Sequence, residues 1–120
     1  MSRRILFVVC GDPRVSARPA EAIRIAAGIA AWKTVEVNLC LRGASVLALD
    51  EAPEELVDAD HFTQYLPILR EFNQTVFVEK GAPFLNAIRH PVLEFQELSD
   101  AELADLTAQW QRVGRIKKPV

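Results

Sequence analysis

The chain has 120 residues, of which 50% are hydrophobic and 25% are charged, and its formal net charge is -2. This length predicts a single domain over residues 1–120 with enough chain to bury a core. The hydrophobic content excludes a disordered chain, and the near balance of charge argues against direct binding to nucleic acid or to an anionic membrane. We therefore expect partners that are proteins or small molecules.

The apolar run Ile5 to Cys10 follows two arginines, which is a weak likeness to a secretory signal. The run is too short for that role and stops at the charged turn of residues 11–14, so we interpret it as a strand. No later stretch approaches the roughly 18 apolar residues of a membrane-spanning helix. We expect a cytoplasmic protein that does not enter a membrane.

Three elements are predicted in the first third of the chain. Ile5 to Val9 is a continuous run of apolar, mostly branched residues, typical of a strand covered on both faces. From Pro19 to Trp32–Lys33, apolar residues recur at spacings of three and four, which predicts a helix. Thr34 to Leu41 alternates apolar and polar residues and predicts a second strand, and its more polar face suggests a place at the sheet edge.

The middle of the chain predicts a loop, two helical segments and a strand. Residues 44–49 fit a short helix, and the acidic segment 50–60 fits a loop. Residues 62–72 place apolar side chains on one helical face, with Pro67 expected to kink the helix or to restrict it to the residues that follow. Thr75 to Val78 is short and β-branched, as in a third strand.

Four further segments complete the pattern. Pro83 to Ile88 predicts a helix, and Val92 to Phe95 a fourth strand. Residues 99–102 read Ser-Asp-Ala-Glu, a capping box that begins the last helix, and residues 112–116 fit a final short strand. This alternation predicts an α/β domain of three layers, with a mainly parallel sheet of about five strands and helices on both faces.

Candidate site residues follow the predicted strands, because ligands of open α/β sheets collect beyond the carboxyl ends of the strands. Cys10 follows the first strand, and Arg14 and Arg18 come soon after it. Neighbouring guanidinium groups and a helix start lower a thiol pKa, which makes Cys10 the candidate nucleophile. The alternative is a buried cysteine at a strand end above a solvated turn. Arg42 and Gly43 follow the second strand and form a candidate anion site, or an ordinary turn.

Glu79 and Lys80 follow the third strand, as an acid–base pair or as two solvated charges. With this lysine the candidate ligand-binding set is Arg14, Arg18, Arg42, Gly43 and Lys80, which suits a small anionic ligand. The glycines lack the spacing of a dinucleotide site or a P-loop. Cys10 and Cys40 form no C-x-x-C pair and have no histidines at ligand spacing, so neither a metal nor a cofactor is expected.

The order of these elements resembles that of the DsrE/DsrF-like (TusBCD-type) sulfur-relay family over nearly the whole chain. The resemblance rests on the first strand, the alanine-rich helix, the second strand closing on residues 41–43, and the opening LSDAEL of the last helix at residues 98–103. It implies a DsrE/F-like fold, flavodoxin-like in general plan, in homo-oligomers or with related subunits. Members pass persulfide sulfur between proteins, and in relay-active subunits the carrier cysteine lies just after the third strand.

In this chain the corresponding residues 78–82 contain Glu79 and Lys80 and no cysteine. Neither a carboxylate nor an ammonium group can take up sulfur by thiolate chemistry. The favoured interpretation is a non-catalytic or regulatory subunit of an oligomer related to sulfur relay. The alternatives are a persulfide carrier that uses Cys10, and a domain that binds a small anion.

The expected oligomer needs a surface for its partner. A sheet this small has few residues with which to cover both faces and edges, so apolar surface around Phe62, Tyr65 and Phe72 is expected to remain for a second subunit.

Overall fold

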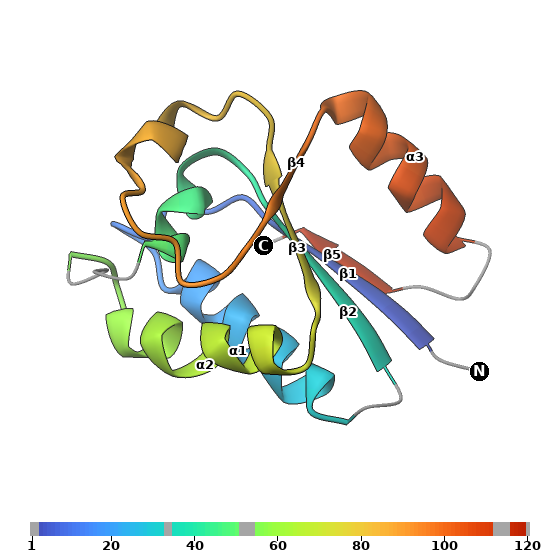
Figure 1. Cartoon of the computed structure of the whole chain (residues 1–120), viewed down its shortest axis with the longest axis horizontal. Coiled ribbons are helices and arrows are strands. Elements are labelled where there is room, and N and C mark those ends of the chain that lie inside the picture. Colours follow the sequence, from blue (N-terminus) through green and yellow to red (C-terminus); the bar gives the residue numbers. More distant parts are fainter. Residues whose placement is uncertain (1–2, 33–34, 51–54, 112–115, 120) are drawn as a thin grey trace.

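A computed structural model of the chain describes residues 3–32, 35–50, 55–111 and 116–119 (Figure 1). Its five strands form one sheet in the order β4-β3-β2-β1-β5, and every neighbouring pair is parallel. The elements are β1 (Arg3–Val9), α1 (Arg18–Ala30), β2 (Val35–Leu41), the 3-10 helix η1 (Gly43–Leu49), α2 (Ala59–Glu71), β3 (Thr75–Glu79), the 3-10 helix η2 (Pro83–Ala87), β4 (Gln96–Leu98), α3 (Asp100–Gln111) and β5 (Ile116–Pro119). The predicted fold class is confirmed.

Helices α1 and α2 cover one face of the sheet (Figure 1). Ala22, Ala26 and Ala30 are buried on α1, and their small side chains let this helix approach the strands closely. Leu66 and Leu69 of α2 are fully buried in the same cluster. This face therefore holds the main hydrophobic core. No helix in the described part of the chain is long and apolar enough to cross a membrane.

Helix α3 lies on the opposite face of the sheet (Figure 1). Beneath it a second cluster contains Leu6, Val8, Cys40 and Phe77, with Leu98, Leu103 and Leu106 packed against it. This cluster is much smaller than the one under α1 and α2. The two layers on the sheet are therefore unequal.

The prediction that the second strand lies at the sheet edge is wrong. Strand β2 lies between β1 and β3, and Glu36 is its one exposed residue. The alternation of polar residues suggested a solvent-exposed face, but Asn38 and Cys40 are buried at this central position. Thr34, where the strand was predicted to begin, is outside the described residues.

Pro67 does not shorten α2. The helix begins at Ala59, within the predicted loop, and continues through Pro67 to Glu71. The core contacts of Leu66 and Leu69 on either side of the proline offset the missing backbone donor. After the helix, Asn73 adopts a left-handed φ of 55°, and the chain then enters β3.

The fourth strand lies four residues later than predicted. Residues 92–95 do not pair with β3, because this segment is drawn toward η1 instead. The Val92 N–H donates to the Leu49 oxygen at 2.9 Å, and Asp50 forms an antiparallel bridge with Pro91. The chain returns to the sheet only at Gln96, where β4 begins.

Other boundaries shift less. Helix α1 ends at Ala30, before the predicted end at Trp32–Lys33. Lys33 is outside the described residues. The two short predicted helices are both 3-10 helices. The final strand is Ile116–Pro119, whereas residues 112–115 of its predicted span are outside the described residues.

The capping box at the start of α3 is confirmed in both directions. The Ser99 hydroxyl accepts a hydrogen bond from the Glu102 N–H at 3.1 Å, and the Glu102 carboxylate accepts one from the Ser99 N–H at 3.0 Å. These bonds satisfy two donors that a helix start leaves without partners.

We expect Ser99→Ala to lower the free energy of unfolding by about 1 kcal/mol, because the Glu102 N–H loses its acceptor. Denaturant melts followed by circular dichroism measure this difference. The control is Thr107→Ala, whose hydroxyl bonds to the Leu103 oxygen within the same helix and whose loss is expected to change stability little. Equal stability of Ser99→Ala and the wild type would contradict the role given to the cap.

Candidate functional site

The carboxyl ends of the three central strands meet at one edge of the sheet. Cys10 follows β1, Arg42 follows β2, and Glu79 ends β3. The Val9 oxygen accepts hydrogen bonds from the Arg42 N–H and from the Ser45 hydroxyl, each at 2.9 Å. These bonds tie the ends of β1 and β2 together and hold the neighbouring side chains in place.

Glu79 is the centre of the polar contacts at this edge. One carboxylate oxygen accepts a hydrogen bond from the Gly43 N–H, and the other accepts one from an Arg42 nitrogen, both at 3.0 Å. The same Arg42 nitrogen also donates to the carboxylate of Asp100, the first residue of α3. The network therefore joins β2, β3 and the start of α3.

Gly43 has a positional reason to be glycine. Its φ of 57° is left-handed, a conformation that other residues adopt at a cost, and this turn aims the Gly43 N–H at Glu79. A residue chosen from the sequence as part of an anion site therefore does contact an anionic group, which is the carboxylate of the chain itself.

The charges of this network support one another. The hydrogen bond from the Gly43 N–H, followed by that from Arg42, lowers the pKa of Glu79. The hydrogen bond to Glu79 in turn raises the pKa of Arg42. Both side chains are about 30% exposed, at 29% for Arg42 and 30% for Glu79, so water weakens the attraction only in part.

The two cysteines differ in environment. Cys10 is exposed, so the alternative of a buried thiol at this strand end is wrong. Cys40 is buried under α3, and burial raises its thiol pKa to about 11. A thiolate is the reactive form, so Cys40 is inert in the folded protein at neutral pH.

The other candidate ligands do not converge on Arg42. Two nitrogens of Arg14 bond to the Asp12 carboxylate at 3.0 and 2.8 Å, and its guanidinium carbon lies 4.7 Å from the centre of the Phe84 ring. The backbone N–H of Arg18 donates to the Ser16 hydroxyl beside α1. Lys80 is exposed, and its charge is among the causes that lower the pKa of Glu102.

The sequence interpretation missed Asp100 as a partner of Arg42 and the central place of Glu79. Glu79 was noted only as half of a pair with Lys80, and Asp100 only as part of a capping box. The positions after parallel strands were a usable signal for Glu79. No comparable signal links Asp100 to Arg42, which lies 58 residues earlier in the chain.

Comparison with known proteins gives a structural likeness. No family model matches the chain, and no curated protein matches its sequence. Among solved structures, the fold is similar to that of the YchN protein from E. coli, with a TM-score of 0.72 and 20% sequence identity. The match covers 98% of this chain and 100% of that chain. At this identity the likeness shows a shared fold alone.

We expect Glu79→Gln to remove part of the acid sensitivity of the fold. Because the pKa of Glu79 is lowered in the folded state, its contribution to stability is present above the unfolded pKa of about 4.3 and is lost as pH falls through the lower folded pKa. Thermal melts from neutral to acidic pH measure this. The exposed Glu97→Gln is the control, and identical pH profiles for Glu79→Gln and the wild type would contradict the prediction.

We expect a thiol reagent at neutral pH to label Cys10 in the folded protein and Cys40 only after unfolding. Exposure makes the first thiol accessible, whereas burial and a pKa of about 11 protect the second. Mass spectrometry of proteolytic fragments separates the two sites. Rapid labelling of Cys40 without denaturant would show that α3 does not cover it.

Proposed function

We propose that the protein is a non-carrier subunit of a DsrE-like sulfur-relay assembly, with a structural or regulatory role in an oligomer. One observation carries the proposal. At the end of β3, next to the place where relay-active members of the family it resembles hold their carrier cysteine, this chain has Glu79 bonded to Gly43 and Arg42. The residue beside the carrier position is therefore a carboxylate with a structural use, and the position just after β3 holds Lys80.

The contacts of Glu79 oppose a role in sulfur transfer. A carboxylate that accepts two hydrogen bonds is held ionised and has no sulfur atom with which to form a persulfide. Arg42 also engages Asp100, so the network ties α3 to the edge of the sheet. This arrangement supports an edge that is kept in one shape, as a subunit interface requires.

The exposed apolar side chains support a protein partner, although not those that the sequence suggested. Phe62 is 1% exposed and belongs to the core, while Tyr65 and Phe72 are half-buried. Trp32, in the turn after α1, is 69% exposed, and Val15, after β1, is 80% exposed. Large exposed aromatic side chains are enriched at protein interfaces.

A persulfide carrier that uses Cys10 is the second candidate, favoured by the exposure of this thiol at the end of β1. In that reaction the Cys10 thiolate attacks the outer sulfur of a donor persulfide, a new S–S bond forms, and the donor leaves as a thiolate. An anion-binding domain has less support, because Arg14 and Arg42 already pair with carboxylates.

The deciding experiment offers a low-molecular-weight persulfide to the folded protein and follows sulfur uptake by mass spectrometry. A non-carrier subunit is expected to load Cys10 no faster than the urea-unfolded chain does, and Cys40→Ser, which leaves Cys10 as the single thiol, is expected to behave like the wild type. Faster loading of folded Cys10, followed by transfer to an acceptor thiol, would replace the proposal with the carrier alternative.

Native mass spectrometry of the same samples tests the oligomer. We expect a multimer at micromolar concentration, and the same multimer in Cys10→Ser, because the assembly does not depend on the thiol. Trp32→Ala is expected to shift the equilibrium toward monomer, with Phe72→Ala as a half-buried aromatic control that keeps the multimer. A monomer at every concentration would overturn the subunit role.

A further inference from the structure

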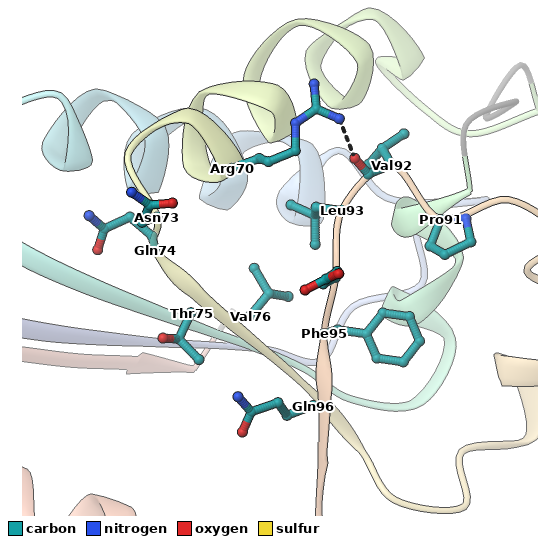
Figure 2. A pocket seen from close by; sticks show the side chains of 11 residues that line it. Arg70, Asn73, Gln74, Thr75, Val76, Pro91, Val92, Leu93, Phe95 and Gln96 are labelled. Carbon is teal, nitrogen blue, oxygen red and sulfur yellow. Dashed lines mark hydrogen bonds between the residues drawn. The ribbon is translucent and has the colours of Figure 1, made fainter.

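A cavity of about 820 Å³ lies at the amino end of β3, away from the Glu79 network (Figure 2). Strands β3 and β4 pair only from Phe77 with Gln96 to Glu79 with Leu98. Before Gln96 the chain turns away toward η1, so Thr75 and Val76, which pair with β2 on one side, have no strand on the β4 side. The cavity fills this wedge, between residues 74–76 and residues 91–96.

The direction of the backbone groups of β3 follows from its hydrogen bonds. The Lys80 N–H donates to the Leu98 oxygen, so residues of even number in β3 aim their N–H groups at the β4 side. The Val76 N–H therefore faces the wedge. The Thr75 N–H faces β2, and the Gln74 carbonyl, on the other side of the same trans peptide, faces the wedge as well.

These two groups form a pair without a strand partner. In the sheet, one residue of a parallel neighbour would donate its N–H to the Gln74 oxygen and accept from the Val76 N–H. Pairing with β4 starts two residues too late for this, and within the described chain no backbone bond joins the Val76 N–H to residues 91–95. A buried peptide donor or acceptor generally has a partner, so this pair is a ready contact for a ligand.

The surroundings of the pair limit what can enter. Val76 and Leu93 are buried core residues and give the cavity an apolar floor. An Arg70 nitrogen donates to the Val92 oxygen at 3.0 Å and ties α2 to the far wall, as Figure 2 shows. This bond bridges the two sides of the wedge at Arg70 and Val92, which favours a compact molecule over an extended chain lying along β3.

The side chain of Gln74 is not free to bind the ligand. Its oxygen accepts from the Val37 N–H at 2.7 Å, and its nitrogen donates to the Phe72 oxygen at 2.9 Å. It fixes the start of β3 and so the direction of the backbone pair. Thr75, Glu94 and Gln96 add polar groups to the lining of the cavity.

We infer that this wedge binds a planar nitrogen heterocycle that carries a hydrogen-bond donor next to an acceptor, as nucleobases and lactams do. The donor would bond to the Gln74 carbonyl, the acceptor would receive the Val76 N–H, and the ring would lie on Val76 and Leu93. A volume of about 820 Å³ lies within the range of small-molecule sites. The site is independent of Glu79, so it stands or falls separately from the proposed function.

The test is titration of ¹⁵N-labelled protein with 2-pyridone, which has the required N–H beside a carbonyl, and with adenine. We expect a saturable downfield shift of the Val76 amide proton with each probe. N-methyl-2-pyridone lacks the donor, and its affinity is expected to fall by about tenfold or more because the Gln74 carbonyl would be buried unpaired. Equal binding of the two pyridones, or an unmoved Val76 signal at saturating probe, would overturn the inference.

A pair of variants on β4 tests the place of binding. Gln96→Phe puts a ring in the lining of the wedge, where β4 begins, and is expected to abolish the Val76 shift. Glu97→Phe alters the next residue, which lines a different hollow beside Gly81 and Pro83, and is expected to keep it. Both residues are exposed, so both variants should fold, as their amide spectra will show. Binding that survives Gln96→Phe unchanged would place the ligand elsewhere.

Discussion

The structure depends on the burial of a central parallel strand on both faces. Strand β2 has β1 on one side and β3 on the other, and its residues are buried except Glu36. A parallel sheet needs a crossover between strands, and the crossovers here carry α1 and α2 to one face. In the described part of the chain, α3 is the one helix on the other face. The unequal layers and the meeting of strand ends at one edge both follow from this order of strands.

The main elements were predictable because their patterns are local. The apolar run of β1, the periodic alanines of α1 and the capping box at Ser99 each reflect contacts within a few residues along the chain. The place of β2 was not predictable, because Asn38 and Cys40 look like residues of a solvated face. Cys40 is buried in a cluster with residues of β1 and β3, against which Leu103 and Leu106 of α3 pack from more than 60 residues away in the chain. Residues 91–95 likewise do not join the sheet as a strand because they contact η1 and Asp50, which lie about 40 residues earlier in the chain.

The candidate site was predictable in location and not in its pairings. Parallel strands end at the same edge, so Cys10, Arg42 and Glu79 were expected near one another. Which charges neutralise each other depends on distances between side chains that the sequence does not contain. Arg42 was expected to bind an external anion, whereas it forms ion pairs with Glu79 and Asp100. Arg14 likewise forms an ion pair with Asp12, two residues earlier in the chain.

The thin layer under α3 has a dynamic consequence. Proteins open in cooperative units, and the unit with the fewest buried apolar contacts opens at the lowest free energy. Leu103 and Leu106 are only half-buried, and the cluster beneath them is small, so α3 is the helix whose detachment disturbs the main core least. Such an opening would bare Leu6, Val8 and Phe77 together as one apolar surface on the sheet. Hydrogen exchange of the backbone amides is then expected to be faster in α3 than in α1. The sheet face that α3 covers is where a transiently opened form of the protein would bind other apolar surfaces most readily.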